Sequence, residues 1–143
     1  MFIGEYQHTI DTKGRMAIPA KFRSVLKKGA IVTRGLDGCL FVYTNDEWKT
    51  LVEKLSQLPI SQQKSRAFAR LMLAGAMDVS LDSQGRILIP EYLRSYAQLK
   101  KNTVIAGLYN RLEVWDSASW ERFKKATEKD STAIAEELGG LGV

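Results

Sequence analysis

DTKGRMAIPAKFRSVL at residues 11–26 and DSQGRILIPEYLRSYA at residues 82–97 carry the same motif. Both read D-x-x-G-R-x-x-I-P-x-x-x-R-S, and they lie 71 positions apart. The correspondence continues upstream, where GEYQHTID at residues 4–11 matches GAMDVSLD at residues 75–82. Downstream, the second copy has one additional loop residue, after which LFVYTNDEW at residues 40–48 matches LEVWDSASW at residues 112–120. The chain therefore contains two copies of one unit, and its function depends on what two copies build together.

The local chemistry of the motif predicts a strand, a tight turn and a short helix in each copy. Asp is favoured at the first position of a type I turn and Gly at the fourth, where φ is positive. We therefore assign turn-forming roles to Asp11, Gly14, Asp82 and Gly85. Such a turn commonly joins the strands of a hairpin, so the flanking strands are expected to pair with each other. Four side chains of the short helices are expected to face the core, namely Phe22, Val25, Leu93 and Tyr96.

The whole pattern predicts an α+β protein in which two pseudo-symmetric units form one barrel-like body with helices between and after them. At 143 residues the chain can bury one good core. The first unit is expected at residues 1–48, a helical connection at 49–74, the second unit at 75–120, and a C-terminal helix with a frayed tail at 121–143. Thr44, three residues before Glu47, predicts the start of one helix.

Composition and charge favour a soluble protein with a polyanionic partner. Hydrophobic residues make up 45% of the chain and charged residues 26%, and neither a membrane span nor a signal peptide is recognisable. We therefore expect a cytoplasmic protein without membrane contact. The net charge is +5, and the excess is N-terminal: up to Leu71 there are 12 basic and 6 acidic residues, and beyond it 9 and 10. This distribution favours a nucleic-acid partner only slightly.

The residues that an enzyme would need are scarce. Two D-[TS]-x-G turns superficially resemble the aspartic-protease dyad, but an extra residue precedes each glycine and an arginine follows it. An adjacent guanidinium keeps a carboxylate ionised, whereas that dyad shares one proton. His8 and Cys39 are the only residues of their kinds and neither is repeated. No phosphate-binding glycine loop or zinc motif occurs. We therefore expect no enzyme, no cofactor and no metal site.

A nucleic-acid interface fits the basic residues of the first copy. A hairpin tip carrying Lys13 and Arg15 is narrow enough to enter a DNA groove. Arginine can bond bidentately to guanine, and nearby lysines can hold phosphates. Further candidate phosphate contacts would supply affinity that does not depend on the DNA sequence: Lys21, Arg23, Lys27 and Lys28.

The doubled motif gives the chain a specific resemblance. Paired D-x-x-G-R turns followed by I-P, with a helical segment between them, resemble the MraZ family over residues 1 to about 125. The resemblance implies two AbrB-type swapped-hairpin domains in a nucleoid-associated transcriptional regulator. Its partners would be double-stranded DNA, at repeated promoter boxes of its own division and cell-wall operon, and further copies of itself in a ring. Residue by residue, it places Arg15 and Arg86 at the DNA contact, with Lys13 on the first loop.

The two copies differ in charge, and this difference suggests unequal roles. Three lysines of the first copy, at positions 13, 21 and 27, correspond to Gln84, Tyr92 and Gln98 in the second. Our hypothesis is that the first copy dominates DNA binding and the second serves mainly assembly. The alternative is an oligomeric scaffold or RNA-binding module in which the D-x-x-G-R turns are purely structural.

Overall fold

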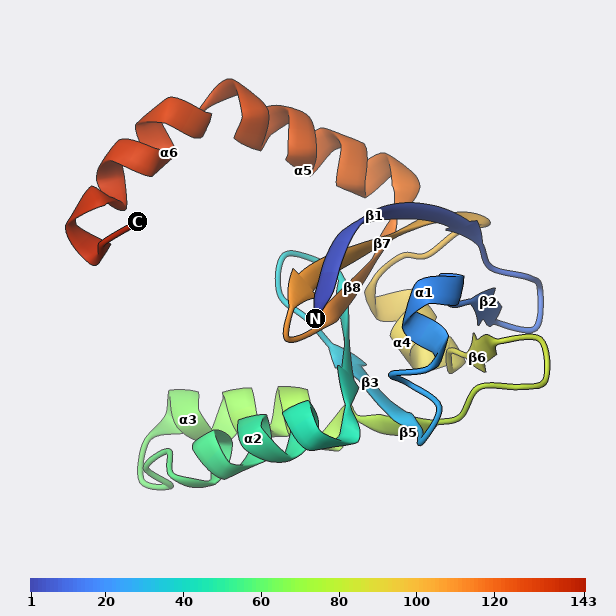
Figure 1. Cartoon of the computed structure of the whole chain (residues 1–143). Coiled ribbons are helices and arrows are strands. Elements are labelled where there is room, and N and C mark those ends of the chain that lie inside the picture. Colours follow the sequence, from blue (N-terminus) through green and yellow to red (C-terminus); the bar gives the residue numbers. More distant parts are fainter.

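The computed structural model describes residues 1–143 and repeats one order of elements twice (Figure 1). The elements of the first copy are β1 (Phe2–Thr9), β2 (Arg15–Ala17), α1 (Ala20–Arg23), β3 (Ala30–Arg34), β4 (Leu40–Thr44) and α2 (Asn45–Ser56). After α3 (Gln63–Ala69) and the π-helical turn η1 (Arg70–Ala74), the second copy comprises β5 (Met77–Val79), β6 (Arg86–Leu88), α4 (Glu91–Tyr96), β7 (Asn102–Tyr109), β8 (Leu112–Asp116) and α5 (Ser117–Lys129). The chain ends in α6 (Ser131–Glu137) and the 3₁₀ turn η2 (Gly139–Leu141).

The main sheet exchanges the first strand of each copy. Its order is β1-β7-β8-β4-β3-β5, and all the pairs are antiparallel. Thus β1 pairs with β7 of the second copy, while β5 pairs with β3 of the first. The predicted α+β class with two pseudo-symmetric units is confirmed. The sheet is nevertheless open and not a closed barrel, because its outer strands β1 and β5 do not pair with each other.

The short strands form a second sheet in which the two copies meet. In the β2–β6 ribbon, Met16 pairs with Ile87, and both side chains are almost fully buried. The expectation that each turn joins two strands of its own hairpin was wrong beyond a single bridge between Ile10 and Met16. A three-residue strand gains little from pairing locally. Pairing across the copies instead buries the apolar face of both short strands in one core.

The turn glycines bond to the other copy. The carbonyl of Gly14 accepts a hydrogen bond from the N–H of Ile89 at 2.8 Å, and that of Gly85 accepts one from Ile18 at 2.9 Å. Both glycines have positive φ, +88° and +76°. At Gly14 a Cβ would lie 2.7 Å from the carbonyl oxygen of Ile89, so a side chain has no room there. The glycine and the isoleucine of the motif are therefore partners, one from each copy.

The main core lies between the sheet and the two short helices, and it contains residues of both copies. Phe22 and Leu93 are buried as predicted, but Val25 and Tyr96 are 47% and 36% exposed. The next residues, Leu26 and Ala97, are buried instead. Their N–H groups donate to the carbonyls of Phe22 and Leu93, four positions earlier. The inward stripe therefore follows the four-residue spacing of a helix and not the three-residue one.

The helices that follow the two copies join the body differently. As predicted, Thr44 caps α2, since its hydroxyl oxygen accepts the N–H of Glu47 at 3.1 Å. A second apolar cluster lies under α2 and η1 and includes Leu55, Met72 and Trp115. The tail that was expected to fray is helical in α6 and η2, and it contains no buried residue. None of the helices combines the length and apolarity of a membrane span.

We predict that Gly14→Ala destabilises the fold more than Gly38→Ala does. Gly38 also has a positive φ, +82°, but no atom lies within 4 Å of the position its Cβ would take. Gly38→Ala should therefore cost only the left-handed strain, about 1–2 kcal/mol. Gly14→Ala adds a clash with a backbone carbonyl and should cost about 1–3 kcal/mol more. Denaturant unfolding measures both, and equal losses would contradict the close approach of the two copies.

Candidate nucleic-acid interface

The two turns lie at the same end of the molecule, on either side of the β2–β6 ribbon (Figure 1). Each turn is organised by its aspartate. Asp11 Oδ1 accepts the backbone N–H of Lys13 at 3.0 Å and that of Arg15 at 2.9 Å. Asp82 Oδ1 accepts the corresponding N–H groups of Gln84 and Arg86, both at 2.9 Å. The two copies therefore present loops of the same local geometry.

Each aspartate also holds the arginine that follows the glycine. Arg15 Nε lies 2.7 Å from Asp11 Oδ2, and Arg86 Nε lies 2.8 Å from Asp82 Oδ2. The arginine side chains are 37% and 27% exposed. Their Nη1 and Nη2 atoms make no hydrogen bond within the protein. Each guanidinium is thus fixed on one side and leaves its two-nitrogen fork free for a ligand.

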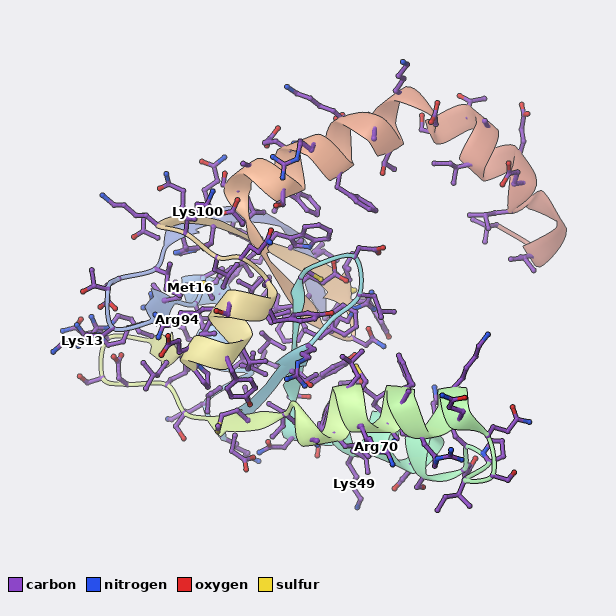
Figure 2. The ribbon with its side chains drawn as sticks, turned by 180° about the vertical axis from the view of Figure 1, so that it is seen from behind. Lys13, Met16, Lys49, Arg70, Arg94 and Lys100 are labelled. Atoms are coloured by element: carbon purple, nitrogen blue, oxygen red, sulfur yellow. The ribbon has the colours of Figure 1, made fainter.

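The ribbon places both arginines on one outward face. Side chains alternate along a strand, and Met16 and Ile87 point into the core. Arg15 and Arg86 therefore lie on the opposite face, at diagonal positions of adjacent strands. Lys13 lies at the outer end of the first loop and is exposed (Figure 2). Because each Asp–Arg pair is neutral, the first loop keeps the positive charge of Lys13, whereas the second loop, with Gln84, keeps none.

The other basic residues that the sequence suggested are distributed around α1. Lys21 is exposed, with its Nζ atom 5.3 Å from the ring centre of Tyr6. Lys27 and Lys28 are exposed in the segment between α1 and β3. Arg23 differs from these lysines: its Nε donates to the carbonyl of Ile18 at 2.9 Å, and its side chain packs on the turn glycine of the second copy. Only Lys13, Arg15 and Arg86 belong to the turns and the ribbon themselves.

Arg94 is a residue of this region that sequence reasoning missed. It corresponds to Arg23 and packs on Gly14, where a Cβ would lie 2.9 Å from Arg94 Nε. That Nε atom is buried and has no hydrogen-bond partner. Figure 2 shows the position of Arg94 in the body. Arg23 of the first copy therefore supports the turn at Gly85, and Arg94 of the second copy supports the turn at Gly14. The repetition of that arginine in both copies was the available signal.

The groups considered for catalysis are arranged unfavourably for it. The pKa values of Asp11 and Asp82 both lie below the ordinary aspartate value, because each carboxylate accepts backbone N–H groups and pairs with an arginine. A dyad that shares a proton requires one raised carboxyl pKa. Burial raises the pKa of the Cys39 thiol, which disfavours the reactive thiolate, and burial lowers the pKa of His8. No group of three or more candidate metal ligands is present.

We predict that the stabilising effect of Asp11 is constant near neutral pH and disappears in acid. The folded pKa of Asp11 is lowered, mainly by the N–H of Arg15, so its contribution is complete above the unfolded value of about 3.9. It is lost as pH falls through the folded pKa. The unfolding free energies of the wild type and Asp11→Asn should therefore differ by a constant amount from about pH 6 to 8 and converge below about pH 4. Convergence between pH 6 and 8 would contradict this assignment.

Comparisons with known proteins agree with this architecture. The family model described as "MraZ protein, putative antitoxin-like" matches the chain twice, at residues 1–71 and 72–140. Similar proteins named "Transcriptional regulator MraZ" occur in Pediococcus pentosaceus and Desulfitobacterium hafniense, both 50% identical, and in Caldanaerobacter subterraneus, 47% identical. Each of these matches covers 100% of both chains. The relatives carry the name of a regulator and not of an enzyme. The chain therefore belongs to the MraZ family of transcriptional regulators.

Proposed function

We propose that this protein contacts double-stranded DNA with the outward face of the β2–β6 ribbon and its flanking turns. One observation carries the proposal: a ribbon made of one strand from each copy holds Arg15 and Arg86 on the same exposed face. A two-stranded ribbon is one of the elements that the major groove of DNA accommodates. In this proposal residues 1–48 and 75–120 are the units that supply the ribbon, and residues 49–74 and 121–143 are helical attachments.

The proposed contacts are of two kinds: base contacts that recognise the DNA sequence, and phosphate contacts that do not depend on it. The free Nη1 and Nη2 atoms of each arginine match the paired acceptors O6 and N7 of guanine. The ion pair to aspartate fixes the orientation of each fork in advance, so little side-chain freedom is lost on binding. Lys13 would bind a phosphate and fix the register. The remaining candidate phosphate contacts add affinity that salt weakens: Lys21, Arg23, Lys27 and Lys28.

The proposed target is a set of short repeated boxes upstream of the protein's own operon, in the division and cell-wall gene cluster. The support for this target is the family resemblance, and the relatives' name as transcriptional regulators agrees with it. The protein would act in the cytoplasm, on the nucleoid. We further propose that copies of the chain assemble into a ring that presents several ribbons side by side. Repeated boxes and repeated ribbons would then raise the overall affinity through effective concentration.

The two loops are proposed to contribute unequally. Both Asp–Arg pairs have the same geometry, so the difference rests on Lys13 and its counterpart Gln84. A loop with net positive charge attracts phosphate, whereas a neutral loop does not. Arg15 would therefore be delivered to a base more effectively than Arg86.

We predict that the wild type prefers the DNA upstream of its gene over scrambled DNA of equal length, and that Arg15→Ala weakens this preference. A base-contacting arginine contributes about 1–3 kcal/mol of discrimination for each ribbon engaged. Fluorescence anisotropy at physiological salt measures both affinities. A wild type that binds both DNAs equally would favour the scaffold or RNA-binding alternative.

The matched comparison for this test is Arg86→Ala. Its Asp–Arg geometry is the same, so any structural damage should be similar in the two variants. We expect a smaller loss of DNA affinity for Arg86→Ala at equal thermal stability. Equal losses, or a larger loss at Arg86, would refute the unequal roles of the two copies.

We predict that exchanging one residue between the loops transfers the phosphate contact. Lys13→Gln should weaken all DNA sequences alike and reduce the slope of log affinity against log salt by about 1. Gln84→Lys should strengthen binding and steepen the slope by a similar amount. The reciprocal pair controls for nonspecific effects of substitution, because each variant only copies the residue found in the other loop. An unchanged slope in Lys13→Gln would exclude a phosphate contact there.

A further inference from the structure

The C-terminal arm, residues 117–143, is anchored to the body only at its beginning. Glu5 of β1 accepts a hydrogen bond from Trp120 Nε1 at 2.9 Å and pairs with Lys124 Nζ at 3.2 Å. The rings of Trp120 and Phe123 pack on Trp115, with centre-to-centre distances of 5.5 and 5.3 Å. These contacts fix the direction in which α5 leaves the sheet. Everything beyond them extends away from the body (Figure 1).

The far end of the arm has an apolar face without a partner. Ile134, Leu138 and Leu141 follow helical spacing and are 40%, 40% and 76% exposed. Glu137, between Ile134 and Leu138, borders this face, whereas Glu136 lies on the opposite side of the helix. Neither glutamate forms an ion pair, and residues 131–143 contain no basic side chain. The end of the arm is therefore an apolar and acidic surface that nothing in its own chain covers.

The helices between the two copies form a groove of complementary character. The groove lies between α2 and α3, has a volume of about 340 Å³, and is lined by apolar side chains that include Leu55, Leu58 and Leu73. Arg66 and Arg70 also line it, and neither has an acidic partner. Figure 2 shows Arg70 on this helix pair. The groove is thus apolar and basic.

We propose that the end of the C-terminal arm of one copy docks in the α2–α3 groove of a second copy of this chain. The leucine and isoleucine face would fill the apolar floor, and Glu137 at its border would meet Arg66 and Arg70. Within one chain the end of the arm stands apart from α2 and α3 (Figure 1), and the contacts with Glu5 and Trp115 hold α5 in that direction. A second copy satisfies both surfaces while the anchor stays intact.

This contact has a definite symmetry. The arm and the groove are different surfaces, so every copy offers both and each contact leaves one of each free. Such heterologous contacts propagate from copy to copy and close into a ring when the rotation between neighbours permits it. The inference rests on the self-assembly part of the proposed function and is independent of DNA binding.

The test is a charge exchange between two full-length variants. The first variant carries Arg66→Glu and Arg70→Glu, and the second carries Glu137→Arg. In each variant alone the arm and the groove have like charges, so the association constant should fall about a hundredfold. In an equimolar mixture every arm finds a groove of opposite charge, and assemblies of wild-type mass should return. Light scattering after size exclusion, without DNA, measures the masses.

The control for the first variant is Lys49→Glu with Lys54→Glu, which makes the same change in net charge on α2 outside the groove lining. This control should keep the wild-type mass. Leu138→Asp, at an exposed position of the arm, should dissociate the assembly without changing the circular dichroism spectrum of the protein.

Several results would overturn the inference. They are a monomeric wild type, unchanged assembly in either charge variant or in Leu138→Asp, and a mixture that fails to recover. A wild-type assembly that shows no preference for the upstream DNA would instead refute the proposed DNA-binding function and leave the docking inference intact.

Discussion

The bond between the turn glycine of one copy and the isoleucine N–H of the other is the constraint on which the rest of the structure depends. It is made twice, by Gly14 with Ile89 and by Gly85 with Ile18, and the β2–β6 ribbon lies between the two bonds. Arg23 and Arg94 pack on the same two glycines, each on the glycine of the other copy. Because every member of this set has its partner in the other copy, a single unit would leave its bonds and its apolar strand faces unpaired.

This contact between the two copies explains why one motif can contribute both to stability and to ligand recognition. The aspartate satisfies the turn amides and, with its second oxygen, holds the arginine. This pairing accounts for the motif structurally, yet it leaves two guanidinium nitrogens free. Because Met16 and Ile87 turn inward, their neighbours Arg15 and Arg86 face outward together, beside the exposed Leu88. The exposed arginine surface is thus a direct consequence of burying the opposite face of the ribbon in the core.

The helical attachments break the symmetry of the body. The first copy is followed by α2, α3 and η1, which fold against the body and leave an apolar, basic groove. The second is followed by α5 and α6, which extend away and expose an apolar, acidic face. Because the groove and the arm are different surfaces, the arm of one copy can bind the groove of the next, and successive copies are then connected in one direction. The near-symmetric body would then carry the DNA contact, and the asymmetric helices would carry assembly.

The sequence by itself determined the features that depend on neighbouring residues. These are the order of the elements, the turns at Asp11 and Asp82, the cap at Thr44 and the charge difference between the copies. The α+β class and the family followed from the doubled motif. Local patterns could not specify which strand pairs with which, because an unpaired strand edge accepts a near or a distant partner with the same hydrogen bonds. The resemblance alone implied that hairpins are swapped. Which strands are exchanged, the cross-copy ribbon, the inward turn of Leu26 in place of Val25 and the bracing role of Arg94 were therefore decided only by tertiary structure. For the strands and for Leu26 the deciding factor was the burial of apolar surface from both copies in one shared core, and for Arg94 it was the close approach of α4 to the turn of the other copy.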